Sequence, residues 1–281
     1  MKIAVVGANG FVGSHVLAAI RARQHACIAV DLHPPTDALR PLAERWIQMD
    51  IHYPPAALFD VIGRPDACIH LAWSGLGNYK SSHHFERELP GQYRFLRTLI
   101  REGLPALVAS GTCLEYGMKT GALNEEMDTA PTTAYGFAKD ALRRQLTFLR
   151  ADVPFAFTWA RLFYVYGEGQ SAKSLWPLLG QAVVRGDKCF PMSEGKQVRD
   201  YLPIETAAGH LVSLAEGLAD IGLVNICSGR PMTLRTVVEN WIRENQWPIM
   251  PEYGRFPYLD YEPMAFWGDV RKFTRWIERF G

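Results

Sequence analysis

The sequence has no uninterrupted apolar run long enough to cross a bilayer, because glycine and proline break its longest hydrophobic stretches. It also has no excess of charge, since 30 Lys and Arg face 29 Asp and Glu for a net charge of +1. We therefore expect neither nucleic acid nor a membrane as a partner. The first residues do not resemble a secretory signal, because Gly7, Asn9 and Gly10 interrupt the apolar stretch and no small-residue cleavage site follows.

Cysteine is scarce, and no two cysteines stand at metal-ligand spacing. The histidine pair at 83–84 also has no carboxylate or cysteine at such spacing, and we expect it on the surface at the start of a helix. We predict no metal site and reduced, mostly buried thiols, as is usual for a cytoplasmic protein. The cysteines are Cys27, Cys68, Cys113, Cys189 and Cys227.

What the sequence does contain is a series of short apolar runs separated by longer amphipathic stretches. Helical patterns cover residues 12–24, 84–102 and 134–151. Continuous apolar strands separated by helices are typical of a parallel sheet that is covered on both faces. The sequence therefore predicts an α/β fold with a doubly wound parallel sheet. The predicted strands lie at 2–8, 26–31, 45–50, 66–73, 106–112, 155–162 and 222–228.

Three glycines, Gly7, Gly10 and Gly13, follow the first apolar run. The first permits a tight turn, the second lets the backbone approach a pyrophosphate, and the third lets helix and strand pack closely. The spacing differs from the commoner G-x-G-x-x-G, so a plain flexible turn is the alternative. The position between a strand and a helix favours a dinucleotide site, with the pyrophosphate at the start of the helix.

Two acidic residues end the next two predicted strands. Asp31 lies 18 residues after Gly13, close to the offset of about 20 at which an acid holds the adenine ribose diol. A carboxylate there would repel a 2′-phosphate, which favours NAD, with NADP as the alternative because Arg40 could reach a phosphate. Asp50 could accept a hydrogen bond from the adenine amino group. Both acids could instead be ordinary turn residues.

Tyr135 and Lys139 share one face of a predicted helix, four residues apart. An ammonium close to a phenol lowers the pKa of the phenol. A tyrosine tuned in this way can exchange a proton with a carbonyl or hydroxyl group while hydride moves. The hydroxyls of Ser110 and Thr112 follow a buried strand and should lie at the same edge of the sheet, where Thr112 could bond the substrate oxygen.

Taken together, these motifs resemble the extended short-chain dehydrogenase/reductase family, and within it the NAD-dependent nucleotide-sugar epimerases, dehydratases and ketoreductases. The similarity rests on VVGANGFVGSHV, CIHLAW, VASGTCLEYG, YGFAK, RLFYVYG and QVRDYLP, and it covers nearly the whole chain in the family's order. It implies a Rossmann domain with bound NAD or NADP, a Ser/Thr–Tyr–Lys catalytic set, and a C-terminal lobe for a nucleotide sugar. It also implies a homodimer built from the helices at 84–102 and 134–151.

The domain prediction combines this resemblance with a change of amino-acid composition near residue 165, where glycine, proline and aromatic residues become frequent. We predict a dinucleotide-binding Rossmann domain at 1–164, with 201–230 returning to it. Residues 165–200 and 231–281 are predicted to form a small substrate-binding lobe.

The family's site residues can be placed on matching positions of this chain. The catalytic set is then Thr112, Tyr135 and Lys139. The predicted cofactor-binding residues are Gly7, Gly10, Phe11, Val12, Gly13, Asp31, Asp50, Ile51, Leu71, Ala72, Trp73, Ser110, Tyr135 and Lys139. The predicted substrate-binding residues are Trp73, Ser74, Thr112, Tyr164, where relatives often carry Asn, and Arg199, which would bind the diphosphate.

Departures from the family pattern reduce the number of reactions that the protein could catalyse. The resemblance implies that 4,6-dehydratases carry Thr-Asp-Glu where this chain has Thr112, Cys113 and Leu114. Neither a thiol nor a leucine side chain suits the acid and base roles that the elimination of water requires. Glu115 stands one position later, and on an extended segment it would point to the opposite face. We therefore predict that the protein is not a dehydratase.

A ketoreductase and an epimerase share the remaining catalytic residues. The short chain and Trp73, which would narrow the sugar site, favour a 4-ketoreductase of an NDP-4-keto-6-deoxyhexose. Asp31 favours the alternative, an NDP-sugar epimerase with tightly bound NAD. A third hypothesis is a non-catalytic dinucleotide-sensing regulator, which we would expect to have lost Tyr135 or Lys139.

Overall fold

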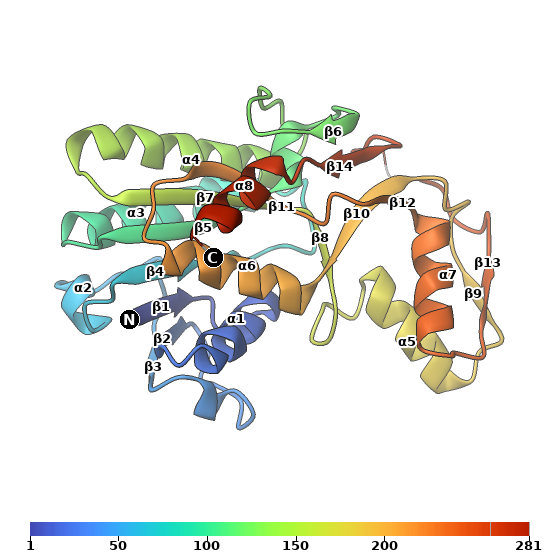
Figure 1. Cartoon of the computed structure of the whole chain (residues 1–281), viewed down its shortest axis with the longest axis horizontal. Helices are drawn as coiled ribbons and strands as arrows, with labels where there is room; N and C mark the ends of the chain where they lie inside the picture. Colours follow the sequence, from blue (N-terminus) through green and yellow to red (C-terminus); the bar gives the residue numbers. More distant parts are fainter. Residues whose placement is uncertain (259, 281) are drawn as a thin grey trace.

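A seven-stranded parallel sheet forms the centre of the computed structural model, which describes residues 1–258 and 260–280 (Figure 1). The chain begins in the middle of the sheet, adds β2 and β3 on one side, and then returns to add β4 on the other. This reversal beside β1 is the point where open α/β sheets bind ligands. The predicted doubly wound Rossmann-type sheet is confirmed. Its order is β11 (Gly222–Ile226), β7 (Ala156–Leu162), β5 (Ala106–Thr112), β4 (Ala67–His70), β1 (Lys2–Val6), β2 (Ala26–Asp31) and β3 (Arg45–Gln48).

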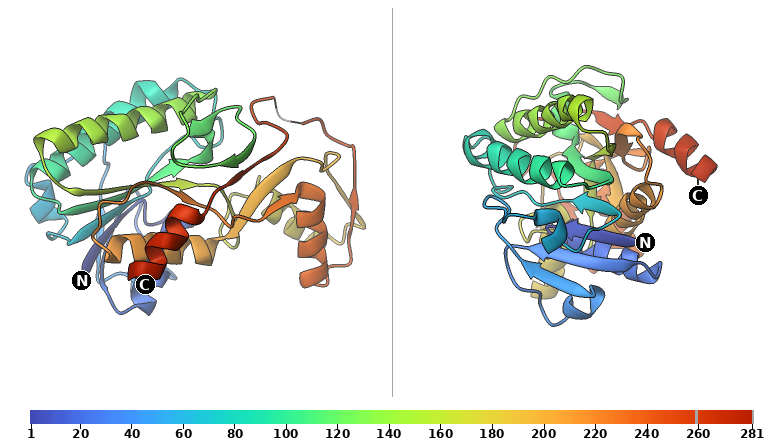
Figure 2. Two further views of the ribbon diagram at one scale, coloured as in Figure 1. Left: turned by 45° about the horizontal axis from the view of Figure 1, so that its top comes forward. Right: turned by 90° about the vertical axis from the view of Figure 1, so that its left-hand side faces the viewer.

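Helices cover both faces of this sheet, because its central strands are apolar on both sides (Figure 2). Alternate residues of one strand enter different cores: Val5 packs on one face and Val6 on the other. The first face carries α1 (Phe11–Ala22), α6 (Ile204–Glu216) and α8 (Arg271–Phe280), and the second carries α2 (Leu58–Val61), α3 (Leu89–Arg101) and α4 (Ala134–Asp152). A π-helical turn, η2 (His84–Glu88), leads into α3.

A smaller lobe lies beyond the end of β7, at the right of Figure 1. Its core contains Leu179, Phe190 and Trp241. The lobe consists of α5 (Leu175–Arg185), β9 (Cys189–Pro191), α7 (Leu234–Glu244) and β13 (Met250–Glu252). A sheet of β8 (Tyr164–Tyr166), β10 (Val198–Pro203) and β12 (Pro231–Thr233) joins it to the main domain, where β6 (Gly121–Leu123) pairs with β14 (Phe266–Gly268).

The chain returns to the main domain twice. Helix α6 and strand β11 lie within the predicted returning segment 201–230. The last helix differs from our expectation, which placed all of 231–281 in the lobe. Phe273 and Trp276 of α8, three residues apart on one helical face, pack into the core that α1 and α6 share. Burying these two aromatic rings brings the end of the chain back to the sheet.

All five cysteines are free thiols, and four of them are buried while Cys189 is exposed. Over the described part of the chain, no group of three or more His, Cys, Asp or Glu side chains is placed to hold a metal ion. In the same residues, none of the helices combines the length and the apolar character that a membrane span requires.

Candidate functional site

The glycine loop between β1 and α1 packs so tightly that side chains do not fit. Gly7 adopts a φ of +87°, and a Cβ atom there would lie 2.7 Å from the backbone nitrogen of Ala72 at the end of β4. A Cβ at Gly13 would lie 2.1 Å from the carbonyl oxygen of Gly7. These contacts match the tight turn and the close helix–strand packing that we predicted for Gly7 and Gly13.

A cavity of about 500 Å³ lies over this loop at the reversal point of the sheet. Most of the predicted cofactor residues line it: Gly7, Gly10, Phe11, Val12, Gly13, Asp31, Asp50, Ile51, Leu71, Ala72 and Trp73. Ser74, predicted for the substrate, lines the same cavity. Ser110, Tyr135 and Lys139 lie outside this lining and meet the cavity through Trp73, whose ring Tyr135 and Lys139 both contact.

The start of α1 fits a phosphate group. Gly10 is the N-cap, and within the described residues no side chain caps the helix and no acidic residue stands in its first turn. The first N–H groups of a helix have no partner inside the helix, and together with the helix dipole they favour an anion. The residues present therefore fit a dinucleotide with its pyrophosphate at Gly10.

Asp31 and Asp50 both line the cavity over the glycine loop. The carboxylate of Asp31 accepts hydrogen bonds from the backbone N–H groups of Asn9 (2.9 Å) and His33 (3.0 Å). Each carboxylate oxygen has a second lone pair, which leaves room for a ribose hydroxyl. Asp50 accepts from the backbone N–H of His52 at 2.9 Å and also lines the cavity.

The sequence analysis missed a buried polar cluster in the cavity wall, centred on Glu88. The Glu88 carboxylate accepts hydrogen bonds from the Ser74 hydroxyl (2.7 Å) and from the Gln92 amide (2.9 Å), and His52 lies 3.3 Å away. Burial by itself would raise the pKa of Glu88, but the bonds from Gln92 and Ser74 outweigh it and the pKa is lowered. The sequence did contain one indication of this cluster, since Glu88 and Gln92 stand one helical turn apart on a largely apolar face.

The histidine pair is not a surface pair, contrary to our expectation. His84 is fully buried, with Nδ1 accepting a hydrogen bond from the Trp73 indole N–H at 3.1 Å. His83 is half-buried, and its Nε2 lies 2.8 Å from the Ser74 hydroxyl oxygen. Both rings stabilise the segment that follows β4.

Tyr135 and Lys139 lie on the first turns of α4, one turn apart as predicted. The Thr133 hydroxyl caps the helix by accepting from the N–H of Gly136 at 3.1 Å. The Lys139 ammonium donates to the carbonyl oxygen of Ser110 at 2.9 Å and lies 4.3 Å from the centre of the Trp73 ring. Its distance to the centre of the Tyr135 ring is 6.0 Å.

The pKa of Tyr135 corrects our expectation of an acidified phenol. Burial, together with the neighbouring Tyr79 and Glu115, raises this pKa well above its ordinary value, and a hydrogen bond with Thr112 offsets only part of the rise. Burial lowers the pKa of Lys139 to about 7 against the opposing charges of Glu115 and Glu88. The ammonium interacts with Ser110 and Trp73 rather than with the phenolic oxygen, so the expected lowering does not arise.

The Lys139 pKa predicts a pH dependence of stability. Between about pH 7 and pH 10.5, Lys139 is protonated in the unfolded chain but has released its proton in the folded protein. The contribution of Lys139 to the free energy of unfolding therefore increases as the pH rises through this range. The slope is at most about 1.4 kcal/mol per pH unit. We expect urea unfolding of Lys139→Met to show a flatter dependence between pH 7 and pH 10 than the unmodified protein. Equal slopes would contradict the burial of a neutral amine.

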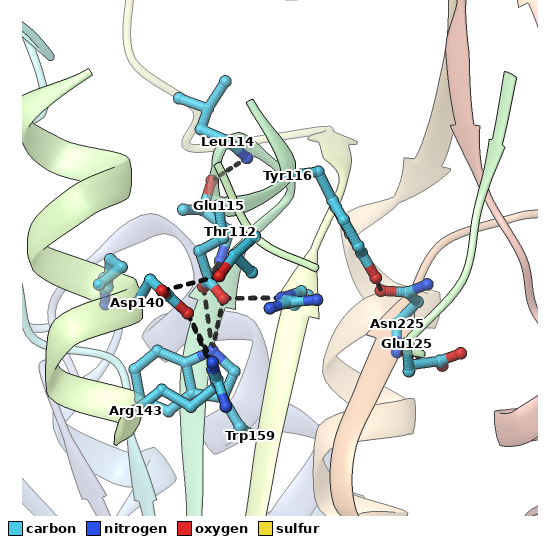
Figure 3. Close-up of polar contacts among 12 residues, drawn as sticks. Thr112, Leu114, Glu115, Tyr116, Glu125, Asp140, Arg143, Trp159 and Asn225 are labelled. Carbon is cyan, nitrogen blue, oxygen red and sulfur yellow. Dashed lines mark hydrogen bonds and ion pairs between the residues drawn. The ribbon is translucent and has the colours of Figure 1, made fainter. Parts of the chain in front are cut away.

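Thr112 ends β5 and caps the short helix η3 (Cys113–Tyr116) by accepting from the N–H of Leu114 at 3.3 Å (Figure 3). This segment is helical, not extended as we expected, and that turn redirects Glu115. The Glu115 carboxylate accepts from the Thr112 N–H at 2.8 Å. It also pairs with Arg161 (2.7 Å) and Trp159 (2.9 Å) on β7, fully buried. Glu115 is thus buried, with its carboxylate hydrogen-bonded by Thr112, Trp159 and Arg161.

A second cavity, of about 310 Å³, lies between the lobe and the main domain and is lined by Tyr164 and Arg199. Arg199 is almost fully buried and donates to Glu262 (2.9 Å) and to the hydroxyl of Tyr164 (3.3 Å). The sequence analysis identified Arg199 but not its partner Glu262. Phe190, Pro191, Met192 and Ser193 also line this cavity.

The Cys113 thiol lies within electrostatic reach of both halves of the site. Burial raises its pKa, with the Glu262 carboxylate adding to the rise and the Arg199 guanidinium opposing it. The same thiol adds to the raised pKa of Tyr135. The thiol therefore interacts electrostatically with Glu262 and Arg199 and also with Tyr135.

Comparison with known proteins places this geometry in a family. Residues 3–227 match the model of the NAD dependent epimerase/dehydratase family. A dTDP-6-deoxy-L-talose 4-dehydrogenase (NAD(+)) from Aggregatibacter actinomycetemcomitans is 28% identical over 95% of this chain and 99% of its own length. A UDP-glucose 4-epimerase from Corynebacterium glutamicum is 27% identical over 85% of this chain and 79% of its own length.

Solved structures confirm the fold. A UDP-glucose-4-epimerase from Stenotrophomonas maltophila, crystallised with NAD and formylated UDP-arabinopyranose, superposes with a TM-score of 0.85 at 20% identity over 98% of this chain and 91% of its own. The family model covers well over half of the sequence, including the glycine loop, Tyr135 and Lys139. The chain therefore belongs to the NAD dependent epimerase/dehydratase family.

Proposed function

We propose that the protein is an NAD-dependent 4-ketoreductase of a nucleotide-activated 4-keto-6-deoxyhexose. The observation that carries the proposal is the packing of Tyr135 and Lys139 on Trp73 at the end of the cofactor cavity. In the same site Cys113 and Leu114 offer no acid for dehydration. Support also comes from the similarity to the 6-deoxy-L-talose 4-dehydrogenase over nearly all of both chains.

The cofactor site follows from the cavity over the glycine loop. The N–H groups at the start of α1 would bind the pyrophosphate, Asp31 the adenine ribose, and Asp50 the adenine amino group. When bound there, NAD(H) supplies the hydride donor or acceptor. Trp73 lines this cavity and contacts Tyr135 and Lys139, so a nicotinamide bound beside Trp73 would lie near both residues.

The proton has a donor in Tyr135. Reduction of a carbonyl needs an acid at its oxygen, and the raised pKa keeps the phenol protonated for this task. Thr112, which hydrogen-bonds with Tyr135, would bind the same substrate oxygen. Lys139, whose pKa burial lowers to about 7, would orient the site through its hydrogen bond to Ser110.

The substrate would bind between the two cavities. Arg199 has the planar donor set that suits a diphosphate, with Tyr164 beside it. Its bond to Glu262 must open or be shared when an anion enters. Trp73 and Ser74 would face the sugar from the opposite wall.

An NDP-sugar epimerase is the second candidate, because UDP-glucose 4-epimerases are similar over most of the chain. Incubation with dTDP- or UDP-4-keto-6-deoxyhexoses and NADH tests the reductase, and incubation with UDP-glucose, which has a 4-hydroxyl to oxidise, and NAD tests the epimerase. Loss of NADH absorbance with one reduced sugar formed per NADH supports the reductase. Interconversion of sugar isomers without net loss of NADH identifies an epimerase, and neither result on any such sugar rejects both.

The cofactor preference gives a prediction at Asp31. Replacing Asp31 with Ala removes the ribose acceptor and the bond to the Asn9 N–H, so NAD binding should weaken. The loss of one hydrogen bond to a charged group amounts to about 1.5–3 kcal/mol, or roughly tenfold to 100-fold. NADP binding, which the carboxylate opposes, should weaken less. An unchanged ratio of the two dissociation constants by calorimetry would contradict the assignment.

We further propose a cytoplasmic homodimer. The thiols are free, which suits a reducing compartment. The outer face of α4 carries Phe137 and Phe148, exposed by 52% and 76%, and a partner could cover them. Light scattering should give twice the chain mass, and Phe148→Asp should shift the protein toward monomer. A monomer at every concentration would reject the dimer.

A further inference from the structure

The Tyr135 ring is enclosed by aromatic side chains of a single segment, residues 73–84. Tyr79 stacks on it with ring centres 5.2 Å apart and planes 23° apart. Trp73 meets it edge-on at 5.8 Å, and His84 lies tilted at 5.3 Å. Because the Tyr79 ring lies nearly parallel to the Tyr135 ring, it limits the tilt of the phenol and hence the direction of its oxygen.

The backbone of Tyr79 anchors the same segment to α4. The N–H of Tyr135 donates to the carbonyl oxygen of Tyr79 at 3.0 Å. This N–H belongs to the first turn of the helix, where N–H groups have no partner inside the helix. Since the main chain makes this bond, a side-chain substitution at Tyr79 removes the stacked ring and leaves the anchor in place.

The other edge of Tyr79 contacts the segment between β13 and β14, which links the lobe to the main domain (Figure 2). The Tyr79 and Tyr261 rings meet edge-to-face, with centres 6.4 Å apart. Lys80 pairs with Asp260 at 3.1 Å, although both side chains are largely exposed and such pairs contribute little. The aromatic contact is therefore the firmer link.

The residue after Tyr261 is Glu262, which holds Arg199 at 2.9 Å. One short segment therefore contacts the stacked Tyr79 on one side and the candidate diphosphate-binding guanidinium on the other. An anion that draws Arg199 away from Glu262 would act on the same segment that contacts Tyr79.

We propose, on the basis of the proposed function, that Tyr79 is a positioning residue for the reaction. Its stacked ring sets the direction of the Tyr135 hydroxyl. Through the contact between Tyr79 and Tyr261, this direction depends on the position of the segment that contains Glu262, the partner of Arg199.

The kinetic test compares Tyr79→Leu with Tyr79→Phe. Misplacing a reacting group by about 1 Å lowers rates by up to about 100-fold, so Tyr79→Leu should lower kcat roughly tenfold to 100-fold. KM for the nucleotide sugar and Kd for NADH should stay within about twofold, because the binding contacts remain. Tyr79→Phe keeps the ring and should retain kcat within about twofold. Equal loss in both variants, or loss in neither, overturns positioning by the ring.

A second measurement does not depend on turnover. With 3-fluorotyrosine at position 135, the fluorine resonance reports the titration of that phenol. Burial and the Tyr79 hydroxyl both raise the pKa of Tyr135, so Tyr79→Leu, which removes the hydroxyl and opens one side of the ring, should lower the titration midpoint more than Tyr79→Phe, which removes the hydroxyl alone. An unchanged midpoint in Tyr79→Leu overturns the proposal. If the midpoint moves but no keto-sugar is reduced, the proposed function fails and the positioning contact stands.

The link to Tyr261 is tested by a double-mutant cycle. The effects of Tyr79→Leu and Tyr261→Leu on kcat should be less than additive, because each removes one side of the same contact. The matched control pairs Tyr79→Leu with Phe280→Leu, an exposed aromatic residue of α8, and should be additive. Additive effects in both cycles would remove the link to Tyr261 from the proposal.

Discussion

Replacing Tyr135 with Phe should lower kcat about 100-fold to 10,000-fold while leaving NADH affinity within about twofold. The variant keeps the ring, and with it the contacts to Trp73, Tyr79 and His84, and loses only the hydroxyl that would donate the proton. The measurement is steady-state turnover of a keto-sugar, together with fluorescence titration of NADH.

A matched control for this variant is Tyr253→Phe. Tyr253 lies in the lobe and its hydroxyl donates to Glu239 at 2.6 Å, away from the cofactor cavity. We expect Tyr253→Phe to retain turnover. If Tyr135→Phe were as active as Tyr253→Phe, Tyr135 could not be the proton donor.

Replacing Gly13 with Ala should have the second large effect, on both folding and cofactor binding. The added Cβ would lie 2.1 Å from the Gly7 carbonyl oxygen, and the backbone must move to relieve the clash. Forcing such an atom into a packed site costs about 1–3 kcal/mol. Displacing the loop also misdirects the N–H groups meant for the pyrophosphate, which should weaken NAD binding roughly tenfold to 100-fold. Urea unfolding and calorimetry measure the two effects.

Gly180 provides the matched control, because it also lies inside a helix and a Cβ there meets no atom within 4 Å. Gly180→Ala should stabilise the protein by up to about 1 kcal/mol through its helix propensity and leave NAD binding unchanged. Similar results for Gly13→Ala and Gly180→Ala would contradict the role assigned to the glycine loop.

The sheet and the cofactor cavity could be predicted because their signals are local. Each buried strand is a short apolar run, and the requirement for glycine at Gly7 and Gly13 arises from a turn only a few residues long. Asp31 follows directly from the end of a strand. Tyr135 and Lys139 are one helical turn apart, so their common face could also be inferred.

The rest of the site depends on contacts between distant segments. The partner of Arg199 is Glu262, 63 residues later, and no periodicity links them. Tyr79 meets Tyr135 because the segment after β4 packs on the start of α4, and it meets Tyr261 because the chain returns from the lobe. The raised pKa of Tyr135 likewise arises from burial by these segments, whereas spacing alone had favoured a lowered value. The turn at Cys113, which redirects Glu115, depends on the buried Arg161 of another strand.

The most direct test of this account is the transfer of deuterium from NADH deuterated at both C4 positions to a dTDP- or UDP-4-keto-6-deoxyhexose, followed by mass spectrometry of the sugar. We expect one deuterium on the sugar ring for each NADH consumed with the unmodified protein, and almost no deuterated sugar formed in the same time with Tyr135→Phe. Reduced sugar without deuterium, or equal incorporation in both proteins, would contradict hydride transfer beside Tyr135.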